Sequence, residues 1–130
     1  MVAEYKPGYV LMHCQGTPGT MQLNPSYADV CCEVAIFFET MMNRLVSRGL
    51  PEENIILDPG IGFAKSFDWD ILAMQHLDTL AALGYPVLLG LSRKRMIGTL
   101  SGLPLAERDE PTAAANIYGY LKGARIFRVH

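Results

Sequence analysis

The fold of this chain is constrained most by four short apolar runs. A longer stretch, in which apolar residues have helical spacing, separates each run from the next. The runs are continuously apolar and do not alternate with polar residues, as in Val87-Leu88-Leu89. Strands of that kind are typically buried on both faces of a parallel sheet that helices cover. The pattern predicts an α/β fold, with parallel strands and alternating helices, in a single domain over residues 1–130. The expected strands are 9–13, 55–57, 87–91 and 124–130, and the expected helices are 26–48, 70–83, 93–100 and 111–121.

The number of these units is a second constraint. Each unit spans about 30–45 residues, as a strand and its crossover helix do. Four such units are half of the eight that close a TIM-type barrel. No helical segment follows the last run, residues 124–130. Because a four-stranded arc leaves apolar edge strands open, we expect either a partial barrel or a sheet that closes against a second copy.

Composition excludes several classes of protein. The 130 residues are 50% hydrophobic and 18% charged with a net charge of −2, which is typical of a globular chain and predicts no nucleic-acid partner. The three cysteines, Cys14, Cys31 and Cys32, lack CxxC spacing, which argues against a disulfide framework and favours a reducing, cytoplasmic setting. We expect Cys31 and Cys32 on a helix, one packed and one near the surface. No apolar run reaches the ~20 residues of a membrane span, so we expect no membrane partner and no signal peptide.

An acidic residue, Asp58, directly follows the second apolar run and opens a glycine-rich loop. Enzymes with α/β folds often present a catalytic or binding acid at this position. The alternative is an ordinary Asp-Pro-Gly turn. As a binding group, Asp58 could accept hydrogen bonds from two adjacent N–H groups of a heterocycle. Phe63 could add a ring stack, whereas we expect Lys65 at the solvated surface.

A basic segment follows the third apolar run. Gly90 ends the run, and Ser92 is placed to cap a helix that would carry Arg93, Lys94 and Arg95 in its first turn. Three cations at a helix N-terminus are unfavourable unless an anion offsets them, so the segment predicts an anion site. The alternative is a solvated basic turn. Since successive helical residues point ~100° apart, the three cations cannot all face one ligand.

Arg128 and His130 lie two residues apart on the last expected strand and therefore on one face of it. We expect Phe127 and Val129 to meet the helices, and Arg128 and His130 to line the interior at the strand's C-terminal end. An arginine and a histidine so placed suit a phosphate or pyrophosphate. The alternative is a frayed terminus with no role.

The loop after the first strand is less informative. We expect His13 to be a structural histidine and not a catalytic base. Thr17 and Thr20 could cap a helix or contact a ligand.

At these positions the sequence resembles the dihydropteroate synthases, of the pterin-binding barrel family. The resemblance covers only the family's C-terminal half, from about the fifth strand to the eighth. It rests on four motifs in order: Leu11-Met12-His13-x-Gln15-Gly16-x-Pro18-x-Thr20-Met21-Gln22, Asp58-Pro59-Gly60-Ile61-Gly62-Phe63-x-Lys65, Ser92-Arg93-Lys94 with Ile97-Gly98, and Arg128-Val129-His130.

The resemblance implies condensation of hydroxymethyl-dihydropterin pyrophosphate with p-aminobenzoate in folate biosynthesis. It assigns the pterin ring to Asp58 and Lys94, the aminobenzoate pocket to Phe63 and Lys94, and the pyrophosphate to Arg128 and His130. Lys94, Arg128 and His130 would be catalytic.

Four further residues are implied to contact substrate: Gly90, Ser92, Arg93 and Arg95. Arg95 stands where many members carry a serine near the aminobenzoate carboxylate. Magnesium is expected for the full enzyme, with its protein ligand outside this chain, and so is a homodimer or another form of self-association.

Two other functions fit the predicted fold. A methyltetrahydrofolate-dependent methyltransferase would also use an acid such as Asp58, but it has no pyrophosphate for Arg128 and His130 to bind. A non-catalytic, self-associating fragment would account for the open strand edges.

Overall fold

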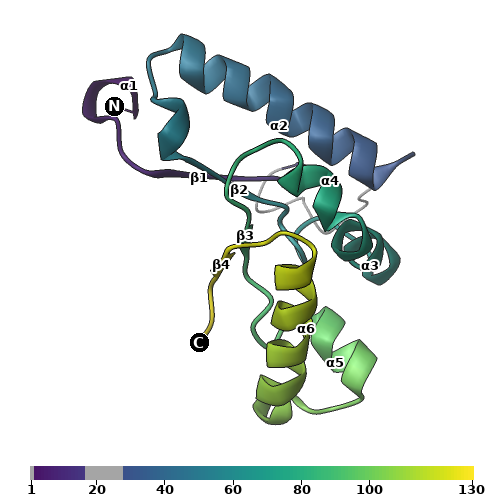
Figure 1. The fold of residues 1–130 in the computed structure, drawn as a ribbon. Helices are drawn as coiled ribbons and strands as arrows, with labels where there is room; N and C mark the ends of the chain where they lie inside the picture. Colours follow the sequence, from purple (N-terminus) through teal and green to yellow (C-terminus); the bar gives the residue numbers. More distant parts are fainter. Residues whose placement is uncertain (1, 17–27) are drawn as a thin grey trace.

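The computed structural model describes residues 2–16 and 28–130 and contains four parallel strands (Figure 1). Strand β1 (Tyr9–Met12) pairs with β2 (Ile55–Asp58), and β3 (Leu88–Leu89) pairs with β4 (Ile126–Phe127). A parallel bridge between Leu57 and Val87 joins the two pairs. The strands therefore follow the order β1-β2-β3-β4, which confirms the predicted parallel α/β fold.

Helices connect these strands. Their bounds are α1 (Val2–Tyr5), α2 (Val30–Ser47), α3 (Phe67–Gln75), α4 (Leu77–Ala81), α5 (Arg95–Ser101) and α6 (Asp109–Leu121), with 3₁₀ turns η1 (Glu52–Asn54) and η2 (Leu105–Glu107).

The longest helix, α2, begins and ends where its local chemistry requires. The Asp29 side chain accepts hydrogen bonds from the N–H groups of Cys31 and Cys32, both at 3.0 Å, and so caps the helix. Gly49, with a φ of +93°, follows its last turn, a conformation that favours glycine. Cys31 is half-buried and Cys32 exposed, as predicted. The predicted start at residue 26 lies outside the described residues.

The helix predicted over residues 70–83 is wrong in both its start and its continuity. It starts at Phe67, because the Ser66 hydroxyl accepts a hydrogen bond from Trp69 N–H at 3.3 Å. It then breaks at His76 into α3 and α4. Apolar residues keep helical spacing across the break, through buried Leu77 and Leu80, so the pattern does not reveal it.

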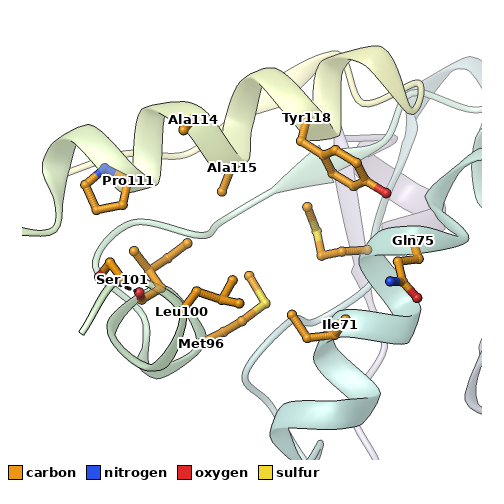
Figure 2. A pocket seen from close by; sticks show the side chains of 11 residues that line it. Ile71, Gln75, Met96, Leu100, Ser101, Pro111, Ala114, Ala115 and Tyr118 are labelled. Carbon is orange, nitrogen blue, oxygen red and sulfur yellow. Dashed lines mark hydrogen bonds between the residues drawn. The ribbon is translucent and has the colours of Figure 1, made fainter. Parts of the chain in front are cut away.

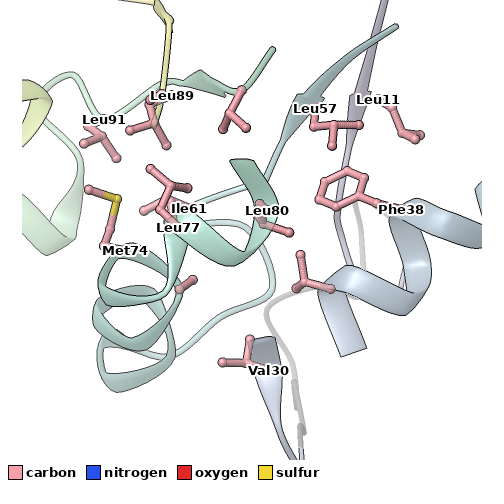
Figure 3. Close-up of a cluster of buried hydrophobic side chains, with 14 of the residues drawn as sticks. Leu11, Val30, Phe38, Leu57, Ile61, Met74, Leu77, Leu80, Leu89 and Leu91 are labelled. Atoms are coloured by element: carbon pink, nitrogen blue, oxygen red, sulfur yellow. The ribbon is translucent and has the colours of Figure 1, made fainter. Parts of the chain in front are cut away.

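The core lies between one face of the sheet and the helices (Figure 3). Leu11, Leu57 and Leu89 project from β1, β2 and β3 toward Phe38 of α2 and Leu77 of α4. On the other face of β1, Val10 and Met12 are 46% and 37% exposed. The prediction of strands buried on both faces is therefore wrong for β1 within the part of the chain that the structure describes.

Regular pairing in β3 and β4 is shorter than predicted. Hydrogen bonds nevertheless continue beyond it, because Arg128 N–H donates to the carbonyl of Leu89 at 2.9 Å. His130 N–H then donates to Ser92 Oγ at 3.3 Å. These bonds keep the end of the chain beside the segment that follows β3. Among the described residues, no helix has the length and apolar character needed to cross a membrane.

Candidate active site

Asp58 stands at the C-terminal end of β2 and is only 8% exposed. Its Oδ1 accepts a hydrogen bond from Gly60 N–H at 2.8 Å. Burial raises the pKa of the Asp58 carboxyl, against that hydrogen bond and the positive charges of Lys94 and Arg128. The structure therefore brings Asp58, Lys94 and Arg128 together, although they come from three separate sequence motifs.

Gly90 makes room for this cluster at the end of β3. A Cβ atom added there would lie 2.4 Å from Nη2 of Arg128, so the guanidinium lies directly over the glycine backbone. Any larger residue at position 90 would displace Arg128. This contact gives Gly90 a physical role beside the predicted anion-binding arginine.

Lys94 reaches from the segment after β3 to the loop after β2. Its Nζ donates a hydrogen bond to the carbonyl of Ile61 and lies 4.4 Å from the centroid of the Phe63 ring. The latter contact is a cation–π arrangement. Burial lowers the pKa of Lys94, while Asp58 raises it. Lys94 and Phe63 thus contact each other across the site. Their role in binding aminobenzoate stays a prediction.

The prediction of three cations in the first turn of a helix is wrong. Helix α5 begins at Arg95, and Arg93 precedes it with a left-handed φ of +54°. Ser92 does not cap the helix, since its hydroxyl accepts the hydrogen bond from His130 N–H. A local turn conformation that spacing does not encode therefore replaces the helical first turn.

Arg93 is engaged by helix α6. Its Nε and Nη2 each lie 2.7 Å from a carboxylate oxygen of Asp109, and its N–H donates to Thr112 Oγ1 at 3.1 Å. Its carbonyl accepts a hydrogen bond from Arg108 at 3.1 Å. The structure thus directs Arg93 toward α6, while Lys94 joins Phe63 and Arg95 is exposed.

Arg128 and His130 are both exposed, and their roles in binding pyrophosphate stay predictions. Arg93 mainly, and His130 to a lesser extent, hold the pKa of Asp109 below its usual value. Phe127 is half-buried and packs toward α6 near Gly119, as predicted. Val129 is 61% exposed, so its predicted contact with helices is wrong for the described residues.

The surface position predicted for Lys65 is wrong, because the residue is 1% exposed. Its Nζ lies 3.2 Å from the carbonyls of Gly60 and Phe63 and 3.0 Å from Nδ1 of His13. Burial mainly lowers the pKa of His13 to about 4, so a neutral imidazole can accept a hydrogen bond from the ammonium group. The structural role predicted for His13 agrees with this contact.

Asp70 lies near the site, although no sequence motif predicted a role for it. It lies in the first turn of α3, is 2% exposed, and its Oδ1 accepts a hydrogen bond from Gly62 N–H at 2.7 Å. Burial raises its pKa, while Lys65 and Lys94 lower it. An acidic residue in a helix's first turn is common, so no local signal distinguishes Asp70.

A separate cavity of about 440 Å³ lies between α3, α5 and α6 (Figure 2). It is lined mainly by apolar side chains, such as Ile71, Met96 and Leu100, and by none of the predicted site residues. Since no charged side chain lines it, this cavity does not suit an anionic substrate.

The magnesium expected for the full enzyme stays a prediction. Asp58 and Asp70 each accept a backbone N–H and lie near lysine side chains, whereas magnesium favours carboxylates and water in an octahedral arrangement. No group of three or more potential metal-binding side chains occurs in residues 2–16 and 28–130. Thr17 and Thr20 lie outside the described residues.

Comparison of the chain with known proteins identifies the family to which it is similar. The family model described as Pterin binding enzyme matches residues 1–130. A dihydropteroate synthase of Haemophilus influenzae is 43% identical over 120 residues, which cover 92% of this chain and 44% of that protein.

Solved structures agree with the sequence match. Dihydropteroate synthase from Thermus thermophilus in complex with 6HMPPP has a TM-score of 0.94 at 41% identity, over 99% of this chain and 51% of that one. The complex of the Thermus thermophilus enzyme with 4-aminobenzoate has a TM-score of 0.88 at 43% identity, over 93% of this chain and 49% of that one.

The chain therefore belongs to the pterin-binding enzyme family. Its relatives named above are dihydropteroate synthases, which confirms the resemblance seen in the four motifs. The chain spans about half the length of these relatives, in agreement with the prediction of a partial barrel.

Proposed function

We propose that this chain supplies one side of the active site of a dihydropteroate synthase. The reaction condenses hydroxymethyl-dihydropterin pyrophosphate with p-aminobenzoate and releases pyrophosphate. The observation that carries the proposal is the convergence of Asp58, Lys94 and Arg128 at the C-terminal ends of adjacent parallel strands. Similarity to structures in complex with 6HMPPP and with 4-aminobenzoate supports the two substrates.

Each of these groups has a chemical part in the proposed reaction. The Asp58 carboxylate accepts hydrogen bonds from pterin N–H groups, and the Lys94 ammonium donates to the pterin ring. Phe63 borders the aminobenzoate ring, and the exposed Arg95 supplies a cation for its carboxylate. Burial favours such directed interactions, because water does not compete for the same groups.

The bond changes balance without a further reactant. The arylamine nitrogen forms a bond to the pterin methylene carbon, and the carbon–oxygen bond to pyrophosphate breaks. The electron pair leaves with pyrophosphate, and the amine nitrogen loses a proton to water. Arg128 and His130 stabilise the charge that develops on the leaving group. The methyltransferase alternative leaves these two residues without a role.

We also propose that the protein self-associates and that it works in the cytoplasm. Three large apolar residues of α6, Ile117, Tyr120 and Leu121, are 63%, 56% and 77% exposed, which supports an apolar interface. The spacing of Cys14, Cys31 and Cys32 matches no disulfide framework, which supports a reducing compartment.

Synthesis of dihydropteroate by the complete polypeptide that carries these 130 residues tests the function. We expect the wild type to form dihydropteroate from the two substrates. Asp58→Ala should weaken binding of the pterin substrate about 10- to 100-fold, because it removes charged hydrogen-bond acceptors. Asp78→Ala is the matched control, since Asp78 is exposed and pairs with Lys122 on the surface. A wild type that makes no dihydropteroate, or equal pterin affinity in Asp58→Ala, would contradict the proposal.

A further inference from the structure

Two buried carboxylates hold the loop that follows β2. Asp58 accepts the N–H of Gly60 at 2.8 Å, and Asp70 accepts the N–H of Gly62 at 2.7 Å. The two acids come from different elements, the end of β2 and the start of α3. The loop backbone is therefore held at two alternate residues, Gly60 and Gly62.

Two lysines hold the carbonyls of the same loop. Lys65 Nζ lies 3.2 Å from the carbonyls of both Gly60 and Phe63, and Lys94 Nζ donates to the carbonyl of Ile61. The loop backbone thus contacts four charged side chains, two of each sign. Such charged hydrogen bonds are stronger than neutral ones, and burial strengthens them further.

The burial of Lys65 is costly and calls for an explanation. At 1% exposure its ammonium group has lost its hydration. Three acceptors lie within 3.2 Å of Nζ, the third being Nδ1 of His13, so the three N–H bonds of the ammonium each have an acceptor. An apolar side chain would fill the same space without this cost, but it would leave these acceptors without their donor.

Asp70 acts on Lys94 as well as on the loop. Lys65 and Lys94 exert the two largest effects of positive charge on the pKa of its carboxyl. Asp70 therefore provides a buried negative charge that acts on Lys94, whose Nζ also contacts Ile61 and Phe63. Asp58 and Asp70 both raise the pKa of Lys94, so this ammonium group is stabilised by two buried carboxylates.

We propose that Lys65 and Asp70 are positioning residues of the active site. Through the loop of residues 60–63 they hold Phe63 and Lys94 in the geometry that binds the second substrate. Neither residue touches the reacting atoms. The inference rests on the proposed function, because it assigns Phe63 and Lys94 to the p-aminobenzoate pocket.

Steady-state kinetics of Lys65→Met in the complete polypeptide tests the inference. Since Lys65 anchors the carbonyl of Phe63, we expect the KM for p-aminobenzoate to rise about tenfold or more, as misplacement of a positioned group commonly causes. The KM for the pterin substrate should change much less. Lys122→Met is the matched control, because Lys122 pairs with Asp78 on the surface, and both KM values should match the wild type.

A lysine that served only stability would give a different result. It would lower the fraction of folded enzyme, and thus the apparent kcat, but the KM of the folded fraction would stay unchanged. An unchanged KM for p-aminobenzoate in folded Lys65→Met would therefore overturn the role of Lys65.

Asp70→Asn is the second variant, and it decides the proposal if Lys65→Met does not fold. The amide oxygen can still accept the Gly62 N–H, so only the charge is lost. We expect the KM for p-aminobenzoate to rise about three- to tenfold, because Lys94 loses a buried partner. Kinetics equal to the wild type would overturn the role of Asp70.

Failure of the proposed function is distinguishable from failure of this inference. Wild-type turnover tests the function, whereas the ratio between variant and wild type tests the positioning. If the wild type makes no dihydropteroate, hydrogen exchange of the Gly60, Gly62 and Phe63 amides still applies. Faster exchange in Lys65→Met than in Lys122→Met would support anchoring of the loop, and equal exchange would overturn it.

Discussion

At the scale of single residues, the candidate site holds charged binding groups whose burial lowers the stability of the fold. Asp58 is 8% exposed, and its pKa is raised mainly because burial disfavours its charge. Three cations, Lys94, Arg128 and Lys65, offset that cost only in part. Sites of this kind commonly sacrifice stability for function.

Asp58→Asn separates these two properties. The amide keeps an acceptor for Gly60 N–H and removes the buried charge, so we expect the free energy of unfolding to rise by about 0.5–2 kcal/mol. Binding of the pterin substrate should weaken at the same time. Thermal unfolding and equilibrium binding measure the two effects. A loss of stability in Asp58→Asn would contradict our account of the raised pKa.

Lys65 gives a prediction for pH. Burial mainly lowers its pKa to about 8, with Asp70, Cys14 and Asp58 acting in the opposite direction and Lys94 in the same one. Above that pH the neutral amine has two N–H bonds for the three acceptors around it. We expect kcat/KM for p-aminobenzoate to fall as the pH rises through about 8, and this alkaline limb to be absent in Lys65→Met.

Stability should respond to the same titration in the opposite sense. The pKa of Lys65 is lower in the folded chain than its ordinary value of 10.5, so the unfolded chain binds more protons between about pH 8 and 10.5. The contribution of Lys65 to the free energy of unfolding therefore rises with pH over that window. Denaturant unfolding of the wild type and Lys65→Met at several pH values would check the sign.

Among the helices and strands, α6 shapes the turn that precedes Lys94. Arg108, Asp109 and Thr112, all at the start of α6, contact the carbonyl, the side chain and the N–H of Arg93 respectively. Arg93 has a left-handed φ of +54°, which is unfavourable for a residue other than glycine. Helix α6 thus stabilises a strained turn whose next residue, Lys94, enters the site.

The contacts of α6 with this turn differ in expected strength. Thr112 is 4% exposed, and Thr112→Val would leave the Arg93 N–H without its acceptor, so we expect a loss of about 1–3 kcal/mol. Asp109→Asn breaks an exposed ion pair that water and salt screen, so its cost should be clearly smaller. Denaturant unfolding would compare both with Thr99→Val, at an exposed position of α5. A larger effect of Asp109→Asn than of Thr112→Val would contradict this ranking.

In the molecule as a whole, the helices bury one face of the sheet, while Val10 and Met12 remain exposed on the other face of β1. Within the described residues, β1 pairs on one side with β2, and β4 pairs on one side with β3. Exposed edge strands and apolar patches favour association. A second apolar surface lies on α6, at Ile117 and Leu121.

Sedimentation of the isolated 130-residue chain should therefore show species larger than 14.4 kDa. The variants Val10→Lys with Met12→Lys test the sheet surface, and Ile117→Lys with Leu121→Lys test the surface of α6. The pair that shifts the chain toward a monomer identifies the interface. A monomeric wild type that binds no hydrophobic dye would contradict self-association.

The order of residues along the chain was enough to predict the parallel α/β architecture and the place of Asp58 at the end of β2. The resemblance to the dihydropteroate synthases assigned Asp58, Lys94 and Arg128 to the substrates of one reaction. Apolar periodicity reports where strands and helices lie, and parallel strands bring their C-terminal ends to one edge of the sheet.

The burial of Lys65 and Asp70, and the turn of Arg93 toward α6, became apparent only in three dimensions. The environment of a charged side chain depends on acceptors and donors that distant segments supply, such as His13 for Lys65 and Asp109 for Arg93. Those partners leave no periodic signal around the residue itself. A charged residue in a loop is therefore predicted to be solvated until the fold places its partners beside it.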